Sequence, residues 1–254
     1  MLYGSMPAEA VIRSMYYPGR IEREHNMRFE LVSAMENQTL SFGLPSLWAG
    51  AGGRFSWKGV CACATNVAGL GNRGREIYRA VGPDGQSVVM KWHSLYPGSN
   101  QASGGYAEAR DPAGAVTFAS SDPTFLARYP FDEVVGMFGK GWDDLTTYTT
   151  EFMTTAQSMS NGSRRVIVSN ELDFFNDLVA SAPDSLQSYS AGFGNDWDLA
   201  VASLAEVTAS VKRSVEGLRT AEALATYVSV MNPSFMASRS ASADSAFMNI
   251  GLYF

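Results

Sequence analysis

The chain has 254 residues, of which 46% are hydrophobic and 17% are charged. This composition is typical of a folded globular protein and excludes a disordered chain. The net charge of -6 argues against nucleic-acid partners. No run of about 18 apolar residues is present, so we expect no membrane span. The N-terminus also lacks the pattern of a signal peptide, which predicts a cytoplasmic protein; if the N-terminus is truncated, the localisation stays unknown.

Both ends of the chain suggest that it is an internal piece of a longer protein. Residues 7–25 predict a helix, with Pro7 in its first turn, that resembles an internal element of a larger protein. Residues 247–254 are apolar and stop without a polar cap. We therefore expect the chain to be cut at both ends and, as a fragment, to be inactive by itself.

The next segments alternate between strand and helix. Residues 29–35 predict a short strand, and residues 54–63 predict another. Between them, residues 44–51 predict a helix that Pro45 opens and Gly52 closes.

A β-hairpin is the clearest local prediction. Residues 76–81 and 86–92 flank Gly82-Pro-Asp-Gly85, whose residue types are typical of a tight turn. Further along the chain we expect a helix at 124–129, a strand at 131–138, a helix at 144–158, a strand at 165–169 and a helix at 171–180. Strands that alternate with helices favour an α/β fold with a parallel sheet, open or closed.

The periodicity changes after this α/β region. Apolar residues recur at steps of three and four from 198 to 230, which predicts one long amphipathic helix. Asn232-Pro-Ser234 breaks it, and a second helix is expected at 234–247. We therefore divide the chain into an α/β domain, residues 1–198, and the start of a helical domain, residues 199–254.

Three loops combine carboxylates with amide or aromatic side chains: Glu36 with Asn37; Trp142 with Asp143 and Asp144; and Asn195 with Asp196 and Trp197. Neighbouring carboxylates repel, which can keep one protonated as a general acid. Tryptophan offers a flat apolar face to a sugar ring. As alternatives, Glu36 is a solvated surface residue and the aspartates are helix N-caps. Together the loops favour a carbohydrate cleft.

Other reactive residues have plainer interpretations. Cys61 and Cys63 are expected to be buried strand residues, since a zinc site would need two more ligands nearby. His93 is expected to be structural, with a role as a ligand or base as the alternative. The glycine-rich stretch 69–74 imitates a phosphate-binding loop, but no clear helix opens directly from it.

Several segments, in order, resemble family 38 glycoside hydrolases, the α-mannosidase family. Met35-Glu-Asn-Gln-Thr-Leu-Ser-Phe-Gly-Leu-Pro-Ser-Leu-Trp-Ala-Gly-Ala-Gly52 resembles the segment that carries the family's nucleophile. Phe138-Gly-Lys-Gly-Trp-Asp-Asp144 resembles its acid/base loop, and residues 165–175 resemble the strand and helix that follow. Residues 195–198 and 209–222 resemble the entry into its helical bundle.

The resemblance implies part of a (β/α)7-type barrel with parallel strands, followed by the start of a helical bundle. It implies zinc-assisted, retaining hydrolysis of α-mannosides or related glycosides, with Asp144 or Asp143 as the acid/base. Glu36 stands where the family has an aspartate that is both nucleophile and zinc ligand. The family's His-x-Asp and later histidine ligands have no counterpart here and are expected outside the chain.

Two alternatives remain open. Because Glu36 replaces the family's aspartate, the protein is alternatively a carbohydrate-binding relative without catalysis. A polysaccharide deacetylase-like metal hydrolase shares the barrel class but needs a His/Asp metal set that the chain does not show.

Overall fold

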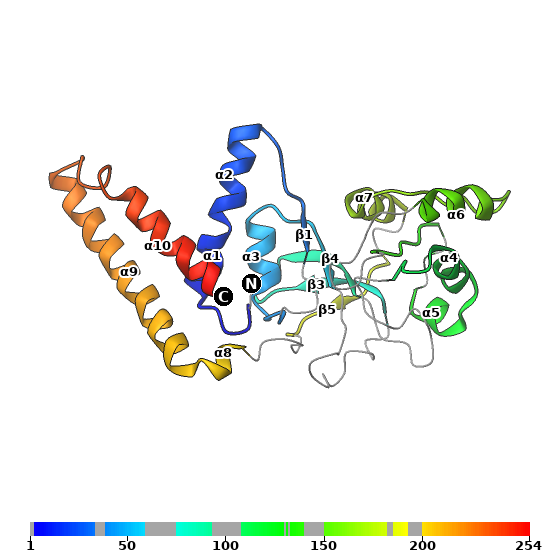
Figure 1. Cartoon of the computed structure of the whole chain (residues 1–254), viewed down its shortest axis with the longest axis horizontal. Coiled ribbons are helices and arrows are strands. Elements are labelled where there is room, and N and C mark those ends of the chain that lie inside the picture. Colours follow the sequence, from blue (N-terminus) through cyan, green and yellow to red (C-terminus); the bar gives the residue numbers. More distant parts are fainter. Residues whose placement is uncertain are drawn as a thin grey trace. The chain divides into compact units, whose positions relative to one another are not determined.

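The computed structural model describes residues 3–33, 39–58, 75–92, 108–129, 131, 133–139, 150–181, 185–192 and 200–254. The chain divides into two compact units (Figure 1). One joins Met1–Arg28 to Trp197–Phe254, and the other comprises Phe29–Asp196. The sequence division at 198/199 groups the first helices with the α/β region, whereas in the structure they belong with the C-terminal helices.

The α/β unit contains a five-stranded sheet in the order β1-β2-β4-β3-β5. Its strands are β1 (Leu31–Ser33), β2 (Phe55–Lys58), β3 (Ile77–Val81), β4 (Ser87–Trp92) and β5 (Ser188–Tyr189). β1, β2 and β4 are parallel to one another, β3 is antiparallel to β4, and β5 is parallel to β3. The fold is therefore α/β with an open, mostly parallel mixed sheet.

This sheet differs from a barrel in which all strands are parallel. Among the described residues it is not closed, because β1 and β5 lie at its two ends. β3 runs against β4 because the hairpin turn between them is tight: Gly82 N donates to Gln86 O at 2.9 Å. Gly85 adopts a φ of 82°, a left-handed conformation that glycine enters without strain. The predicted hairpin is thus confirmed, and it excludes a uniformly parallel arrangement.

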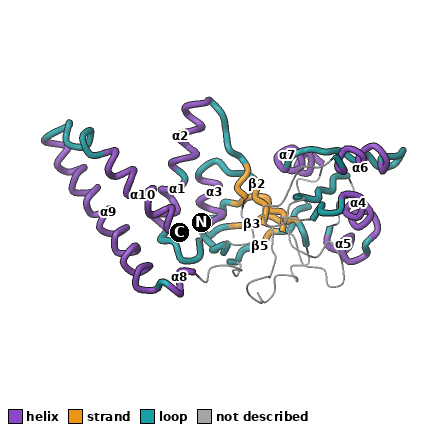
Figure 2. The backbone as a smooth tube through the Cα atoms, viewed as in Figure 1, coloured by secondary structure: helices purple, strands orange, loops and turns teal. Residues whose placement is uncertain are grey.

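One face of the sheet carries the aromatic core. Phe55, Trp57, Ile77 and Val89 pack there with residues of α4 (Pro112–Ser121), α5 (Pro123–Arg128) and α7 (Glu171–Ser181). Phe55 stacks on Phe175 of α7 with ring centroids 5.0 Å apart. The shorter α3 (Leu44–Gly50) contacts β3 and β4, and Figures 1 and 2 show it on the other side of the strands. The sheet therefore lies between α3 and the helices of the aromatic core.

Several local predictions are confirmed. The predicted helix at 7–25 forms as α1 (Ala8–Ser14) and α2 (Tyr16–His25), and α3, α5 and α7 lie where helices were expected. The helix predicted at 144–158 is observed as α6 (Glu151–Met159) in its described part. β1 and β2 occupy the expected strands.

Other local predictions are wrong. No strand forms in the described residues between 131 and 138, nor at 165–169. Ile167 and Val168 have strand-forming side chains, yet they are 55% and 51% exposed, and this segment pairs with no strand in the described part of the chain. Helix α4 and strand β5 were not predicted.

The helical unit joins the two ends of the chain. It contains α1, α2, α8 (Ala200–Ser203), α9 (Ala205–Met231) and α10 (Ser240–Tyr253). The predicted helix at 198–230 is interrupted at Leu204, whose φ of -109° and ψ of 40° are not helical. No helix of the described residues is long and apolar enough to cross a bilayer.

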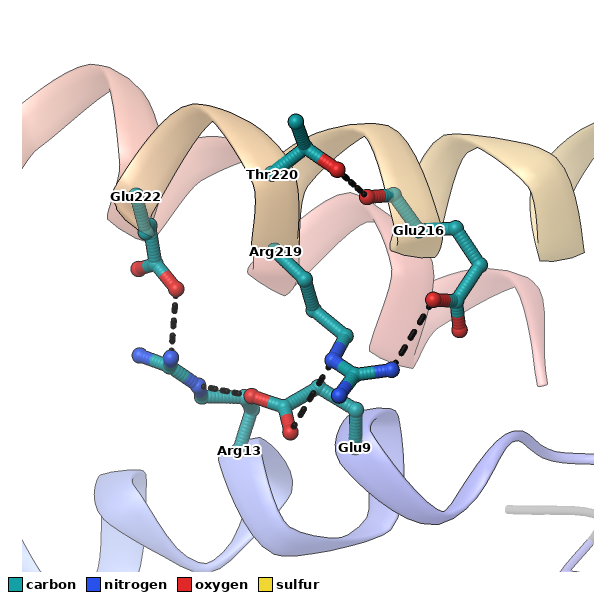
Figure 3. A network of polar contacts seen from close by, with 6 residues as sticks. All are labelled: Glu9, Arg13, Glu216, Arg219, Thr220 and Glu222. Atoms are coloured by element: carbon teal, nitrogen blue, oxygen red, sulfur yellow. Dashed lines mark hydrogen bonds and ion pairs between the residues drawn. The ribbon is translucent and has the colours of Figure 1, made fainter. Parts of the chain in front are cut away.

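A polar network connects α1 to α9 (Figure 3). Arg13 donates from Nε to Glu9 Oε1 at 2.9 Å and from its guanidinium to the Glu222 carboxylate. Arg219 donates to Glu216 Oε2 at 2.9 Å, and its Nε lies 3.9 Å from Glu9 Oε2. Glu9 and Arg13 therefore contact residues that lie far along the chain: Arg13 and Glu222 are 209 positions apart.

Candidate functional site

The residues predicted to act on a sugar lie outside the described residues. They are Glu36, Asn37, Trp142, Asp143, Asp144, Asn195, Asp196 and Trp197. The same is true of Cys61, Cys63, His93 and residues 69–74. The structure does describe the strands and segments that lead into the three predicted loops, and it shows at which edge of the sheet each of them ends.

The segment that precedes Glu36 ends at the carboxyl edge of the parallel strands. Ser33 is the last residue of β1 and pairs with Trp57, the last but one of β2. Lys58 ends β2 and pairs with Trp92, which ends β4. Because these three strands are parallel, their carboxyl ends share one edge of the sheet. That edge is where open α/β sheets commonly bind ligands.

The segment that precedes Trp142, Asp143 and Asp144 reaches the same edge. Phe138 places its ring edge-on against Trp57, with centroids 5.0 Å apart and an interplanar angle of 85°. The ammonium nitrogen of Lys91, on β4, lies 5.0 Å from the centre of the same ring. Phe138 and Gly139 therefore lie beside the carboxyl ends of β2 and β4.

The third predicted loop follows a strand that runs the other way. β5 is parallel to β3, and β3 is antiparallel to β4, so β5 ends at the opposite edge of the sheet. There Ser190 Oγ donates to Val81 O at 3.3 Å, next to the hairpin turn. The structure thus brings together the described residues that lead to Glu36 and to Asp143, but not those that lead to Asn195.

A buried ion pair lies under the carboxyl edge. Lys91 Nζ donates to Glu108 Oε1, and both side chains are 0% exposed. The second oxygen, Glu108 Oε2, accepts the backbone N–H of Phe138 at 2.7 Å. Two further backbone bonds join the same segments: Glu108 N donates to Phe138 O at 2.9 Å, and Ala109 N donates to Gly139 O at 2.9 Å.

More polar groups are buried nearby. Tyr129 donates its phenol proton to Val134 O at 2.6 Å. Burial raises the pKa of Tyr129, and the negative charges of Glu108 and Glu76 raise it further, so the phenol stays protonated. Glu76 itself is fully buried. This part of the core therefore combines aromatic packing with a polar cluster, which is costly to bury unless its members are bonded.

The indole of Trp57 adds a donor at this edge. Its Nε1–H is buried and has no hydrogen-bond partner in the described part of the chain. Leaving a buried donor unpaired costs about 1–3 kcal/mol. A polar group that reached this N–H would recover that free energy.

Sequence reasoning did not identify Lys91 or Glu108. A signal for Lys91 was present, because Val88-Val-Met-Lys-Trp92 places a charge within an apolar strand, and a buried charge requires a partner. Glu108 carries no comparable signal in its own segment. Its role depends on Lys91 and Phe138, which are 17 and 30 residues away.

No metal site is formed within the described ranges. There, no three His, Cys, Asp or Glu side chains lie close enough together to hold an ion. His25 is exposed at the end of α2. Glu36, the zinc ligand implied by the resemblance, is outside those ranges.

No family model matches the chain, and comparisons with curated proteins and with solved structures found no significant match. Function is therefore inferred from the residues of this chain and from the geometry of the sheet edge.

Proposed function

We propose that the intact protein is a retaining glycoside hydrolase that acts on α-mannosides or related glycosides, as family 38 enzymes do. The proposal starts from the ordered resemblance of residues 35–52, 138–144 and 209–222 to that family. One structural observation supports it most directly. The described residues before Glu36 and those before Asp143 and Asp144 end at one edge of the sheet.

Chain length is compatible with a shared site at that edge. Glu36 follows Ser33 by three residues and Asp144 follows Gly139 by five. An extended chain advances at most about 3.5 Å per residue. The backbone can therefore carry Glu36 up to roughly 10 Å from Ser33, and Asp144 up to roughly 17 Å from Gly139. A retaining mechanism requires them to stand about 5–5.5 Å apart. Contact of Trp57, which pairs with Ser33, and Phe138 keeps the anchors close enough for this.

In this mechanism, Glu36 attacks the anomeric carbon as the bond to the leaving oxygen breaks. Asp144, or its neighbour Asp143, gives that oxygen its proton. The resulting carboxylate then removes a proton from water, which attacks the anomeric carbon and releases Glu36. The adjacent aspartates favour one protonated carboxyl at neutral pH. Trp142 and Asn37 bind the sugar by stacking and by hydrogen bonding.

Asn195, Asp196 and Trp197 belong to this proposal as further sugar-binding residues, although β5 ends at the opposite edge. Zinc belongs to it as well, with Glu36 as the ligand that the resemblance assigns to this chain. The described residues form no ligand set for it.

The test uses the intact protein with an aryl α-mannoside and with a reagent that labels the nucleophile of retaining glycosidases. We expect label on Glu36 and a loss of about 10²–10⁴ in turnover for the variant of the true acid, Asp144→Asn or Asp143→Asn. Asp177→Asn, an exposed position on α7, is the matched control and should keep wild-type turnover.

Each other outcome has a distinct meaning. Full activity in both Asp143→Asn and Asp144→Asn overturns the acid/base assignment. Sugar binding without turnover or labelling supports the carbohydrate-binding alternative instead. Neither binding nor turnover on any glycoside tested refutes the proposal as a whole.

A further inference from the structure

We propose that Lys91 and Glu108 form a positioning pair that holds the segment leading into the acid/base carboxylates. The inference rests on the proposed function of Asp143 and Asp144, and it assigns a task to two residues that the mechanism does not otherwise use. Neither residue reaches solvent, since both side chains are 0% exposed, so neither binds substrate directly.

The Glu108 carboxylate joins two parts of the fold. One oxygen accepts from Lys91, which belongs to the sheet, and the other accepts from the backbone N–H of Phe138 at 2.7 Å. Phe138 is in turn held between Trp57 and Lys91 by its ring. The backbone at Phe138 is thus fixed relative to β2 and β4 from two directions.

Packing restricts the same segment from the other side. A side chain at Gly136 would have its Cβ only 2.5 Å from the ring of Phe174, so the backbone passes directly over α7. The Phe138 ring also lies edge-on to Phe174, with centroids 5.0 Å apart. The segment 136–139 therefore has little freedom where it approaches the sheet edge.

The ion pair itself is a poor source of stability. Removing two charges from water opposes folding, and apolar residues of similar volume often replace such a pair without loss. Apolar residues, however, supply no acceptor for the N–H of Phe138. The Glu108 carboxylate supplies that acceptor, with one oxygen on Phe138 N–H and the other on Lys91. The direction of these hydrogen bonds favours a role in positioning over a role in stability.

Position matters at this point because catalysis is sensitive to small displacements. A shift of about 1 Å in a catalytic group can lower turnover by about 10²-fold. Asp143 follows Phe138 by five residues along the chain. Releasing Phe138 should therefore lower kcat more than it changes KM.

Two double variants separate the hydrogen bond from the charge. Lys91→Met with Glu108→Gln removes both charges but retains an amide oxygen that can accept from Phe138 N–H. Lys91→Met with Glu108→Met removes the acceptor as well. We expect the first to keep kcat within about threefold of wild type and the second to lose about 10- to 100-fold, with KM changed less than about threefold.

Two readouts distinguish positioning from simple unfolding. kcat is counted per active site, by titration with the labelling reagent, so unfolded molecules do not contribute. Amide hydrogen exchange at Phe138 is measured in parallel and should be faster in the methionine pair than in the methionine–glutamine pair. If the methionine pair does not fold, Glu108→Asp gives the same test, because it keeps the charge and shortens the reach to Phe138.

The outcomes separate this inference from the proposed function. Equal kcat and equal exchange at Phe138 in the acceptor-retaining and acceptor-lacking variants overturn the positioning role, while an active wild type leaves the glycosidase intact. A wild type without glycosidase activity overturns both, since the pair then has no acid/base segment to position.

Discussion

Replacing Gly136 by alanine should destabilise the α/β unit through a steric clash. The added Cβ would lie 2.5 and 2.7 Å from two carbon atoms of the Phe174 ring and 2.9 Å from the Phe138 ring. Carbon atoms in good contact are about 3.5–4.0 Å apart, so something must move by roughly 1 Å. Both rings are buried in the aromatic core and cannot swing aside freely.

The magnitude combines two opposing terms. Overpacking a core of this kind costs about 1–3 kcal/mol. Gly136 does not have a positive φ, so alanine fits its backbone and gains about 0.4–1 kcal/mol by restricting the unfolded chain. We therefore expect Gly136→Ala to lower the free energy of unfolding by about 1–2 kcal/mol.

Chemical denaturation of the full chain, followed by tryptophan fluorescence, measures this change. Gly162→Ala is the matched control, because a Cβ there meets nothing within 4 Å and its φ is not positive. The control should be as stable as wild type or slightly more stable. If Gly136→Ala is no less stable than Gly162→Ala, the packing described between residues 136 and 174 is not what limits this segment.

Two further predictions concern local bonds. Asp122 caps α5 by accepting from Phe125 N at 2.8 Å. Asp122→Ala should therefore lower the free energy of unfolding by about 1 kcal/mol, whereas Asp122→Asn keeps an acceptor and should lower it less. Equal losses for the two variants, measured by chemical denaturation, would argue against capping. The hydrogen bonds from Ser46 and Gln86 lower the pKa of Asp84 below its ordinary 3.8. Its stabilisation is therefore present above that value and disappears as the pH falls through the lowered pKa. The difference in Tm between wild type and Asp84→Asn should be constant near neutral pH and should shrink toward zero in acid. A difference that does not change with pH would contradict this.

The elements that could be predicted are those that short-range chemistry decides. The hairpin follows from Gly82-Pro-Asp-Gly85, and α3 from a proline at its start and a glycine after its end. Both signals act over a few residues. The strand predicted at 165–169 shows where this reasoning fails, because strand-forming residues such as Ile167 still need a neighbour to pair with.

The candidate site was predictable only in part. Residue types identified Glu36, Asp143 and Asp144 as candidates, but not which loops share an edge of the sheet. That depends on strand direction, and the antiparallel β3 carries β5, and the segment after it, to the other edge. Lys91 and Glu108 were not predicted as a pair, because a buried ion pair depends on contact between two residues that are 17 positions apart and not on the sequence around either one.

The α/β class, the positions of most helices and the hairpin follow from the sequence, since caps, turns and periodicity operate between near neighbours. The strand order, the contact of Phe138 with Trp57 and Lys91, and the association of α1 with α9 become known only from the three-dimensional structure. These features depend on contacts between residues far apart in the chain, such as Arg13 and Glu222. Such contacts form only when the whole unit buries its apolar surface, so no local pattern encodes them.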